Sequence, residues 1–218
     1  ALLAPCEAFA AQVTQRPLPA PLPAKVAASA LGAGGEEALQ LPRFLQSSGL
    51  TAAGRGSANH AALEQLDLTR PLDRADIHAQ LAALVKAERL TPLLAKAVDV
   101  PALARYFASP LGERMRAAQR LERELPFTMQ TDAYSLLGEG EGQLVTVQGV
   151  VDACFQEGDS WVLLDYKTDR ILPEGEQATA ARHLPQLSLY ARAVTQALGP
   201  VREAYIVLLR TGSAVRLI

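Results

Sequence analysis

The chain has 218 residues, a formal net charge of −2 and 49% hydrophobic residues. This is enough for one sizeable domain with a core, and it argues against wholesale disorder. A protein that grips nucleic acid by charge alone is usually basic, so any such affinity must be local or supplied by a partner. Two cysteines, Cys6 and Cys154, match no zinc or disulfide framework, and they exclude a four-cysteine iron–sulfur cluster within the chain.

The first 53 residues are rich in Ala and Pro, with alternating prolines from Pro17 to Pro23. This pattern is typical of an extended linker, so we expect residues 1–53 to be an arm or an interdomain connection. The chain has no run of 18 apolar residues and no basic leading region, so we expect neither a membrane span nor a signal peptide. Because it begins without Met, we expect a fragment of a longer polypeptide.

Residues 54–125 carry helical signals. Gly54 to Gly56 is typical of a turn, and Ser57 can cap a helix that runs through His60. Apolar residues at helical spacing predict a second helix from residue 74 to 90. Thr91-Pro92 and Ser109-Pro110 each place a cap residue before a first-turn proline, and the second predicts a helix that reaches Leu121.

From Pro126 the apolar period changes to that of strands, which we expect at 127–134, 144–155, 161–168, 204–209 and 214–218. Residues 156–160 read as a hairpin turn, and a helix is expected from about Ala178 to Leu198. Helices followed by strands, a helix and more strands indicate a mixed α/β fold, in which helices flank a mixed central sheet and a helical cluster precedes it. We expect a single domain over residues 54–218, with a helical part (54–125) and a catalytic sheet and helix (126–218).

Two apolar strands each carry one carboxylate, Asp152 and Asp165, and the hairpin turn lets them meet on neighbouring strands. Lys167 follows two residues after Asp165 and therefore points the same way. Two hard oxygen ligands suit Mg²⁺ or Mn²⁺, and a lysine beside them could orient a water or stabilise a phosphate. Such a site could cut a phosphodiester. The alternative is that Asp152 is a turn residue and Asp165–Lys167 an ordinary ion pair.

Five motifs in the same order resemble the PD-(D/E)XK nuclease superfamily, and most closely the RecB-type nuclease domain of AddA-type helicase–nuclease subunits. The similarity covers roughly residues 54–218. An R-G-x-x-x-H element matches Arg55 to His60, and an E-x-P-F element matches Glu124 to Phe127. The remaining matches are G-V-V-D ending at Asp152, D-Y-K-T from Asp165, and Q-x-x-x-Y from Gln186 to Tyr190.

The resemblance implies a role for each matched residue. Metal ligands would be His60, Asp152, Asp165 and the backbone carbonyl of Tyr166, with Mg²⁺ (or Mn²⁺) as the ion. Lys167 would position the attacking water. Gln186 and Tyr190 lie four residues apart, hence on one helical face, where they could bind the DNA backbone or hold the lysine. On its own, this last spacing also fits an ordinary amphipathic core helix.

The resemblance further implies a restriction-endonuclease-like fold and a metal-dependent DNA exonuclease module of an ATP-dependent helicase–nuclease, active in double-strand break processing and recombinational repair. Its partners would be a DNA strand fed from a duplex end, an upstream helicase domain of the same polypeptide, and an AddB-like subunit in the bacterial cytoplasm at the nucleoid. The chain has no G-x-x-x-x-G-K-[ST] motif, so we expect the ATP site elsewhere and no iron–sulfur cluster here. The alternatives are a standalone exonuclease and a catalytically silent DNA-binding or docking module.

Several polar residues stay open. Glu124 could be a further acid of the metal site, or pair with Arg120 or Arg123. Asp169 is expected to cap a turn. Arg55 could touch phosphate or pair with an acid such as Glu64. Two histidines have no motif around them and are expected to be structural: His78 and His183.

Overall fold

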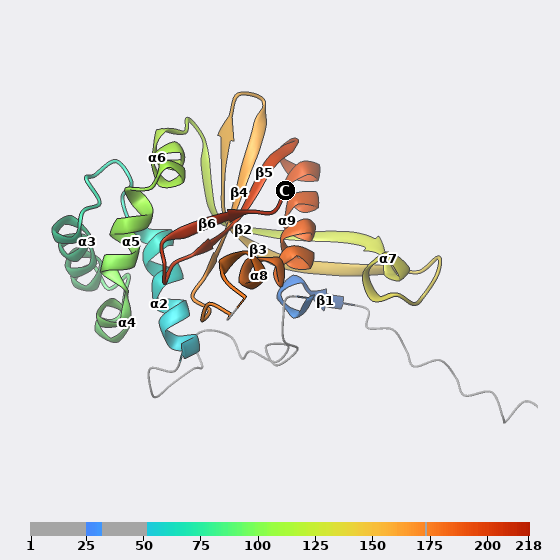
Figure 1. Cartoon of the computed structure of the whole chain (residues 1–218), viewed down its shortest axis with the longest axis horizontal. Coiled ribbons are helices and arrows are strands. Elements are labelled where there is room, and N and C mark those ends of the chain that lie inside the picture. Colours follow the sequence, from blue (N-terminus) through green and yellow to red (C-terminus); the bar gives the residue numbers. More distant parts are fainter. Residues whose placement is uncertain (1–24, 32–51, 173) are drawn as a thin grey trace, which may run out of the picture.

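A computed structural model describes residues 25–31, 52–172 and 174–218 of the chain. Its centre is a six-stranded mixed sheet with helices on both sides, which confirms the expected fold class (Figure 1). The strands are β1 (Lys25–Ala27), β2 (Leu121–Asp132), β3 (Leu144–Glu157), β4 (Ser160–Lys167), β5 (Val201–Leu208) and β6 (Ser213–Arg216). Their order is β1-β3-β4-β5-β6, with β2 pairing with β3. Only the β1–β3 and β4–β5 pairs are parallel.

A cluster of helices precedes the sheet in the chain: α2 (Ala52–Gln65), α3 (Arg74–Lys86), α4 (Pro92–Ala97), α5 (Val100–Phe107) and α6 (Pro110–Ala117). The expected caps at Thr91 and Ser109 are confirmed, because each side chain accepts a backbone N–H of the first turn. The remaining helices are the 3₁₀ turn η1 (Ala28–Leu31), α7 (Ala133–Leu137), α8 (Glu176–Ala181) and α9 (Leu184–Ala197).

Three expectations about element ends are wrong. The segment Gly54 to Gly56 is not a turn, because α2 begins at Ala52 and includes it. Helix α6 ends at Ala117, so Leu121 opens β2 instead of continuing a helix. The helix expected from Ala178 is two helices: Pro185 has no N–H and starts a new helix instead of extending α8.

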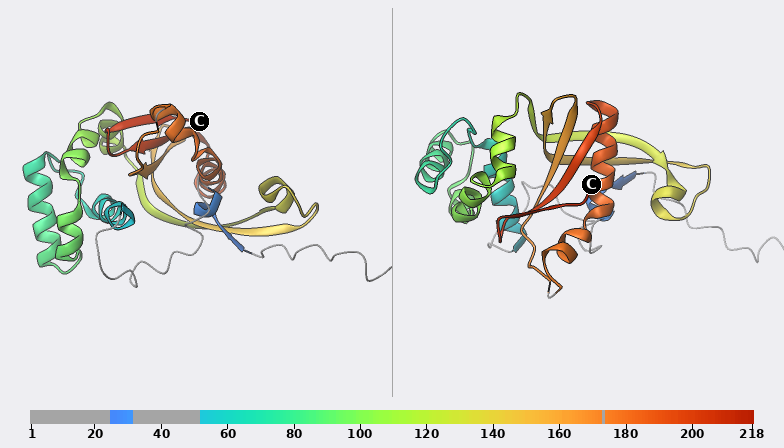
Figure 2. Two further views of the ribbon diagram at one scale, coloured as in Figure 1. Left: turned by 60° about the horizontal axis from the view of Figure 1, so that its bottom comes forward. Right: turned by 45° about the horizontal axis from the view of Figure 1, so that its top comes forward.

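The core lies on both faces of the sheet. On β4 the side chains alternate: Val162, Leu164 and Tyr166 pack against the helical cluster, whereas Trp161 and Leu163 pack on the opposite side with α9. Figure 2 shows the helical cluster and α9 on opposite sides of the sheet. The end of β4 is therefore held from both sides, and its last residues emerge between the two helical layers.

Part of the expected N-terminal arm belongs to the sheet. Strand β1 pairs in parallel with residues 146–148 of β3, whereas β2 occupies the other edge of β3. Residues 1–24 and 32–51 lie outside the described part of the chain, so the role of residues 1–53 as a linker stays a prediction. The same holds for the division of the domain at residues 53 and 125, although β2 already begins at Leu121.

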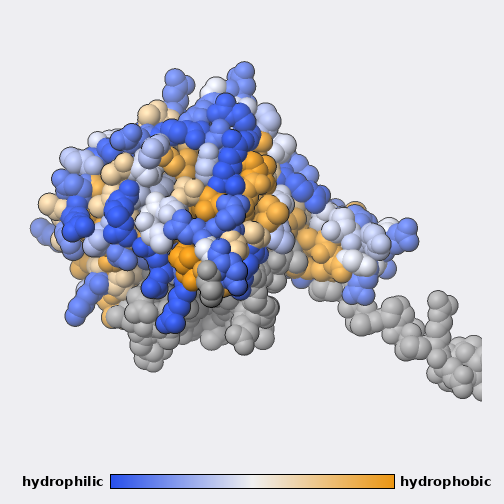
Figure 3. All heavy atoms as spheres, viewed as in Figure 1, coloured by the Kyte–Doolittle hydropathy of each residue, from blue (hydrophilic) through white to orange (hydrophobic). Residues whose placement is uncertain are grey.

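The long β2–β3 hairpin projects from the body and carries α7 at its tip (Figure 1). The face in Figure 3 is mostly polar, with apolar residues gathered near α9 and along the hairpin. Tyr134 and Leu144 are exposed at the hairpin tip. Across the described residues, no helix has the length and apolar character that a membrane crossing needs.

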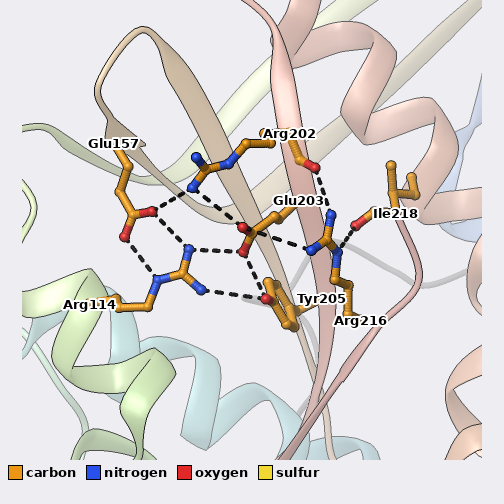
Figure 4. Close-up of polar contacts among 7 residues, drawn as sticks. All are labelled: Arg114, Glu157, Arg202, Glu203, Tyr205, Arg216 and Ile218. Carbon is orange, nitrogen blue, oxygen red and sulfur yellow. Dashed lines mark hydrogen bonds and ion pairs between the residues drawn. The ribbon is translucent and has the colours of Figure 1, made fainter.

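A network of ion pairs ties α6 to the sheet at the β3–β4 turn (Figure 4). Arg114 donates from Nε and Nη2 to the two carboxylate oxygens of Glu157, at 2.9 and 2.8 Å, and from Nη2 to Glu203 at 2.8 Å. Arg202 and Arg216 add further pairs to these acids. The network lies near the start of β4, whereas Asp165 and Lys167 lie at its end, so its role is to join elements away from the acid pair.

Candidate active site

Three carboxylates form a row across three neighbouring strands. The pairs Arg123↔Ala153 and Leu125↔Val151 flank Glu124 and Asp152, which therefore lie opposite each other on β2 and β3. The β3–β4 ladder ends at Ala153↔Leu164, so the next step of the same register brings Asp152 opposite Asp165. The hairpin turn at Gly158–Asp159 produces this register, as the sequence indicated.

Helix α2 brings His60 to this row. Its Nε2 donates to the backbone carbonyl of Tyr166 at 3.0 Å. The other ring nitrogen, Nδ1, lies 3.3 Å from Asp152 Oδ1 and 3.9 Å from Glu124 Oε1. Within the described residues, Nδ1 is buried and has no well-aligned hydrogen-bond partner. A histidine whose one nitrogen is held by a carbonyl while the other faces carboxylates has the usual geometry of a metal ligand.

The start of the R-G-x-x-x-H motif lets α2 approach β4 closely. A Cβ at Gly56 would lie 3.2 Å from Thr168 Oγ1, directly after Lys167. Asn59 is buried and accepts the N–H of Asp99, the N-cap residue of α5, so it fixes α2 to the rest of the cluster. The side chain of Arg55 lies outside the described residues, so its expected role stays a prediction.

Asp165 and Lys167 point the same way, with Lys167 Nζ 2.8 Å from Asp165 Oδ2. The ion pair of the alternative interpretation therefore exists. It is not a surface pair, however, because the Asp165 side chain is 1% exposed and that of Lys167 18%. Their contact is an ion pair whose angles are not those of a hydrogen bond, since Oδ2 has no hydrogen-bond partner within the described part of the chain. Burial of this kind carries a desolvation cost that a surface pair does not.

The electrostatics of the row show an excess of negative charge. Burial disfavours a charged His60, but the charge of Asp152 and hydrogen bonding to Asp152 and Glu124 outweigh it and raise its pKa to about 10. Burial raises the pKa of Asp165, and the neighbouring charge of Asp152 adds to this rise against the opposing effect of Lys167. A proton on His60 and the charge of Lys167 thus compensate the carboxylates. A divalent cation could replace that proton.

The α9 motif packs directly on the strands that carry the acids. Gln186 Nε2 donates to the Tyr190 hydroxyl at 2.7 Å, and both side chains are buried. Burial raises the pKa of Tyr190, and the charges of Asp165 and Asp152 raise it further, which is the effect of a phenol that faces these acids. The two residues are therefore both part of the core stripe and neighbours of the acid row, so the two interpretations of their spacing do not exclude each other.

Phe127 explains why E-x-P-F and G-V-V-D occur together. It pairs across the strands with Gly149, and a Cβ at Gly149 would lie 2.7 Å from its ring. The same ring meets Tyr190 edge-on, with centroids 5.6 Å apart. The glycine thus makes room for an aromatic ring that supports Tyr190.

Glu124 faces the cluster, a choice that the sequence left open. Arg120 pairs with Glu122, and Arg123 donates to the carbonyls of Leu63 and Leu66. His60, Glu124 and Asp152 each offer a ligand atom, and these atoms lie within 4.8 Å of one another. Glu124 also has φ +50°, a left-handed conformation that is strained for a non-glycine residue and that clusters at functional sites.

The other two histidines differ from each other. His78 is exposed on α3. His183 is buried, and its Nε2 lies 3.3 Å from an oxygen of Asp169, which was expected to cap a turn. This contact ties the segment after β4 to the start of α9, so Asp169 links two elements of the site. A pattern search could not have paired them, because neither residue belongs to a motif.

A family model described as the PD-(D/E)XK nuclease superfamily matches residues 30–216. The chain belongs to this superfamily. The matched range includes every residue of the acid row and the α9 motif, together with β3 to β5 and most of β6. PD-(D/E)XK domains carry acids and a lysine on adjacent strands, which is the arrangement of Asp152, Asp165 and Lys167.

The chain is also similar to proteins named as the A-type (AddA) component of an ATP-dependent helicase/nuclease. It is 45% identical over 181 residues to that of Pelotomaculum thermopropionicum, covering 80% of this chain and 14% of the relative. It is 44% identical over 178 residues to that of Desulforudis audaxviator (79% and 14%), and 41% identical over 176 residues to that of Geobacillus kaustophilus (76% and 14%). The chain therefore spans about one seventh of the length of these relatives, and its similarity concerns one PD-(D/E)XK domain.

Proposed function

We propose that this PD-(D/E)XK domain is the metal-dependent DNA exonuclease module of an AddA-type helicase–nuclease that processes double-strand ends for recombinational repair. The observation that carries the proposal is the convergence of His60, Glu124 and Asp152 beside the buried Asp165–Lys167 pair. Three elements far apart in the chain supply these side chains: α2, β2 and the β3–β4 hairpin. Their joint burial has a high electrostatic cost without a counter-ion.

The residues present fit a divalent metal. His60 Nδ1, Asp152 and Asp165 would be ligands, and Glu124 adds a fourth candidate because it lies in the same group. The carbonyl of Tyr166 holds His60, and its second lone pair leaves it available as a ligand. Oxygen-rich sites of this kind favour Mg²⁺, with Mn²⁺ as a suitable substitute in experiments because it accepts imidazole readily. The bound ion would supply Lewis-acid activation of a water and of the scissile phosphate.

Lys167 would stabilise the phosphate and orient the attacking water. Burial opposes its charge, but Asp165 and Asp152 outweigh this and raise its pKa, so the ammonium stays protonated at neutral pH. A protonated lysine can donate hydrogen bonds and cannot act as a base. Gln186 and Tyr190 would hold the strand or the lysine from the opposite side.

The wider setting is also part of the proposal. The relatives' names and lengths support a helicase domain elsewhere in the same polypeptide, where the ATP site would lie. A motor that feeds a single strand into the site would remove the need for a basic surface, which suits the net charge of −2. A partner protein of the AddB type and a location in the bacterial cytoplasm at the nucleoid complete the proposal.

The test is Mg²⁺-dependent degradation of single-stranded DNA by the wild type, Lys167→Ala and Asp165→Ala. The exposed His78 of α3 offers a matched control, His78→Ala. We expect both site variants to lose at least about 100-fold in rate and the control to retain the wild-type rate. The assay is run on this chain and on the full polypeptide with its helicase domain. DNA binding without cleavage by both wild-type proteins would favour the docking module, and equal rates in all four proteins would refute the assignment.

A further inference from the structure

The backbone of Tyr166 connects two candidate metal ligands that come from different parts of the fold. Its N–H donates to Asp152 Oδ2 at 2.8 Å, and its carbonyl accepts from His60 Nε2 at 3.0 Å. Asp152 belongs to β3, whereas His60 belongs to α2. One peptide segment of β4 therefore sets the relative position of a helix ligand and a strand ligand.

The side chain of Tyr166 points the other way, into the helical cluster. Its ring meets that of Tyr106 edge-on, with centroids 5.5 Å apart. The two hydroxyls lie 3.4 Å apart, and each lies 3.5 Å from Met115 Sδ. Tyr106, Met115 and Tyr166 are all at most 3% exposed. These partners come from α5 and α6, so the ring is enclosed by the same cluster that carries α2.

The polar contacts of the two hydroxyls are long, and sulfur is a weak acceptor, so ring packing contributes more to this anchor than hydrogen bonding. The alternation of β4 separates the two roles of the strand. Asp165 and Lys167 share one face, while the Tyr166 ring between them packs on the opposite face with the helices. A change in how the ring is seated would therefore move the amide and the carbonyl that hold Asp152 and His60, without removing either ligand.

We propose that Tyr166 is a positioning residue: its ring, seated between Tyr106 and Met115, sets the spacing of His60 and Asp152 through its own amide and carbonyl. The inference rests on the proposed function, because it needs a metal held by those two side chains. It adds that the helical cluster determines metal affinity through α5 and α6, although neither helix carries a ligand. Residues that orient metal ligands typically change metal affinity by 10- to 100-fold when replaced.

The test measures Mn²⁺ binding to the metal-free chain by titration calorimetry, alongside the melting temperature and the metal dependence of DNA cleavage. Tyr166→Leu removes the ring, whereas Tyr166→Phe keeps it and removes only the hydroxyl. Tyr106→Leu empties the seat from α5 and leaves β4 unchanged, so it tests the same idea if Tyr166→Leu does not fold. Leu81→Ala is the control, because Leu81 is buried in the same core cluster on α3, which carries no ligand.

We expect Tyr166→Leu and Tyr106→Leu to raise the Kd for Mn²⁺ about tenfold, with kcat recovering to within about threefold of wild type at saturating metal. Tyr166→Phe should stay within about threefold in Kd. Leu81→Ala should lower the melting temperature by a similar amount and leave the Kd unchanged. Wild-type affinity in both leucine variants, or the same loss of affinity in Leu81→Ala, would reduce Tyr166 to a packing residue. Absence of Mn²⁺ binding by the wild type would instead overturn the proposed function itself.

Discussion

Metal binding should depend steeply on pH, because the metal and a proton compete for His60. Asp152 and Glu124 outweigh the effect of burial and raise the pKa of His60 from 6.5 to about 10. The metal-free protein therefore carries an imidazolium at neutral pH, and a metal can bind Nδ1 only after that proton has left. Binding should release one proton, so the apparent affinity should increase as the pH rises towards 10.

The size of the effect follows from this pKa. Displacement of one proton well below the pKa changes the apparent affinity about tenfold per pH unit, which is about 1.4 kcal/mol. Between pH 6 and pH 8 the Kd for Mn²⁺ should fall about 100-fold. The stability of the metal-free protein should follow the opposite trend. A raised histidine pKa contributes stability that is fully present below about pH 6.5 and is lost as the pH rises through about 10.

The assay is calorimetric titration with Mn²⁺ at pH 6, 7 and 8, in pairs of buffers with different ionisation enthalpies, so that released protons are counted directly. His60→Gln keeps a polar side chain without the titrating ring, and its Kd should be weaker at pH 8 and nearly independent of pH. Equal wild-type affinity at pH 6 and pH 8, or binding without proton release, would refute the competition at His60.

Three further predictions concern other parts of the structure. Gly149→Ala would place a Cβ 2.7 Å from the Phe127 ring; denaturant unfolding should show a loss of about 1–3 kcal/mol and the DNA assay a lower rate, and an unchanged unfolding curve would contradict the close approach. Glu203→Ala breaks the network around Arg114 and should lower the unfolding free energy by about 1–2 kcal/mol with no change in cleavage rate, so a loss of activity in the folded variant would count against their separation. Glu124→Gln keeps the shape and removes one charge opposite Asp152; calorimetry should show about tenfold weaker Mn²⁺ binding, and unchanged affinity would remove Glu124 from the metal site.

The sequence was sufficient for the fold class and for the neighbourhood of the acids. The turn before β4 fixes the register that brings Asp152 opposite Asp165, and the two-residue spacing fixes the common direction of Asp165 and Lys167. Both are local consequences of strand geometry, so they can be derived without knowing the tertiary structure. Confirmation of the family came from the match over residues 30–216.

Features that depend on tertiary contacts were not derivable in the same way. Strand β1 forms because three residues of a Pro- and Ala-rich segment find an open edge on β3, and nothing in their own pattern marks a strand. The orientation of Glu124 depends on a positive φ within β2, which no sequence rule assigns to a glutamate. The contact of Tyr166 with Tyr106 joins residues from β4 and α5, and only the packed structure reveals it.

The most direct test of the central claim is the anomalous scattering of Mn²⁺ in a crystal of this chain soaked with the ion. The proposal predicts one strong peak bounded by His60 Nδ1 and Asp152, next to Glu124 or Asp165, and its loss in a crystal of Asp152→Asn. A well-diffracting crystal with no peak among these side chains, or with its strongest peak elsewhere, would contradict the assignment of a metal-dependent nuclease site.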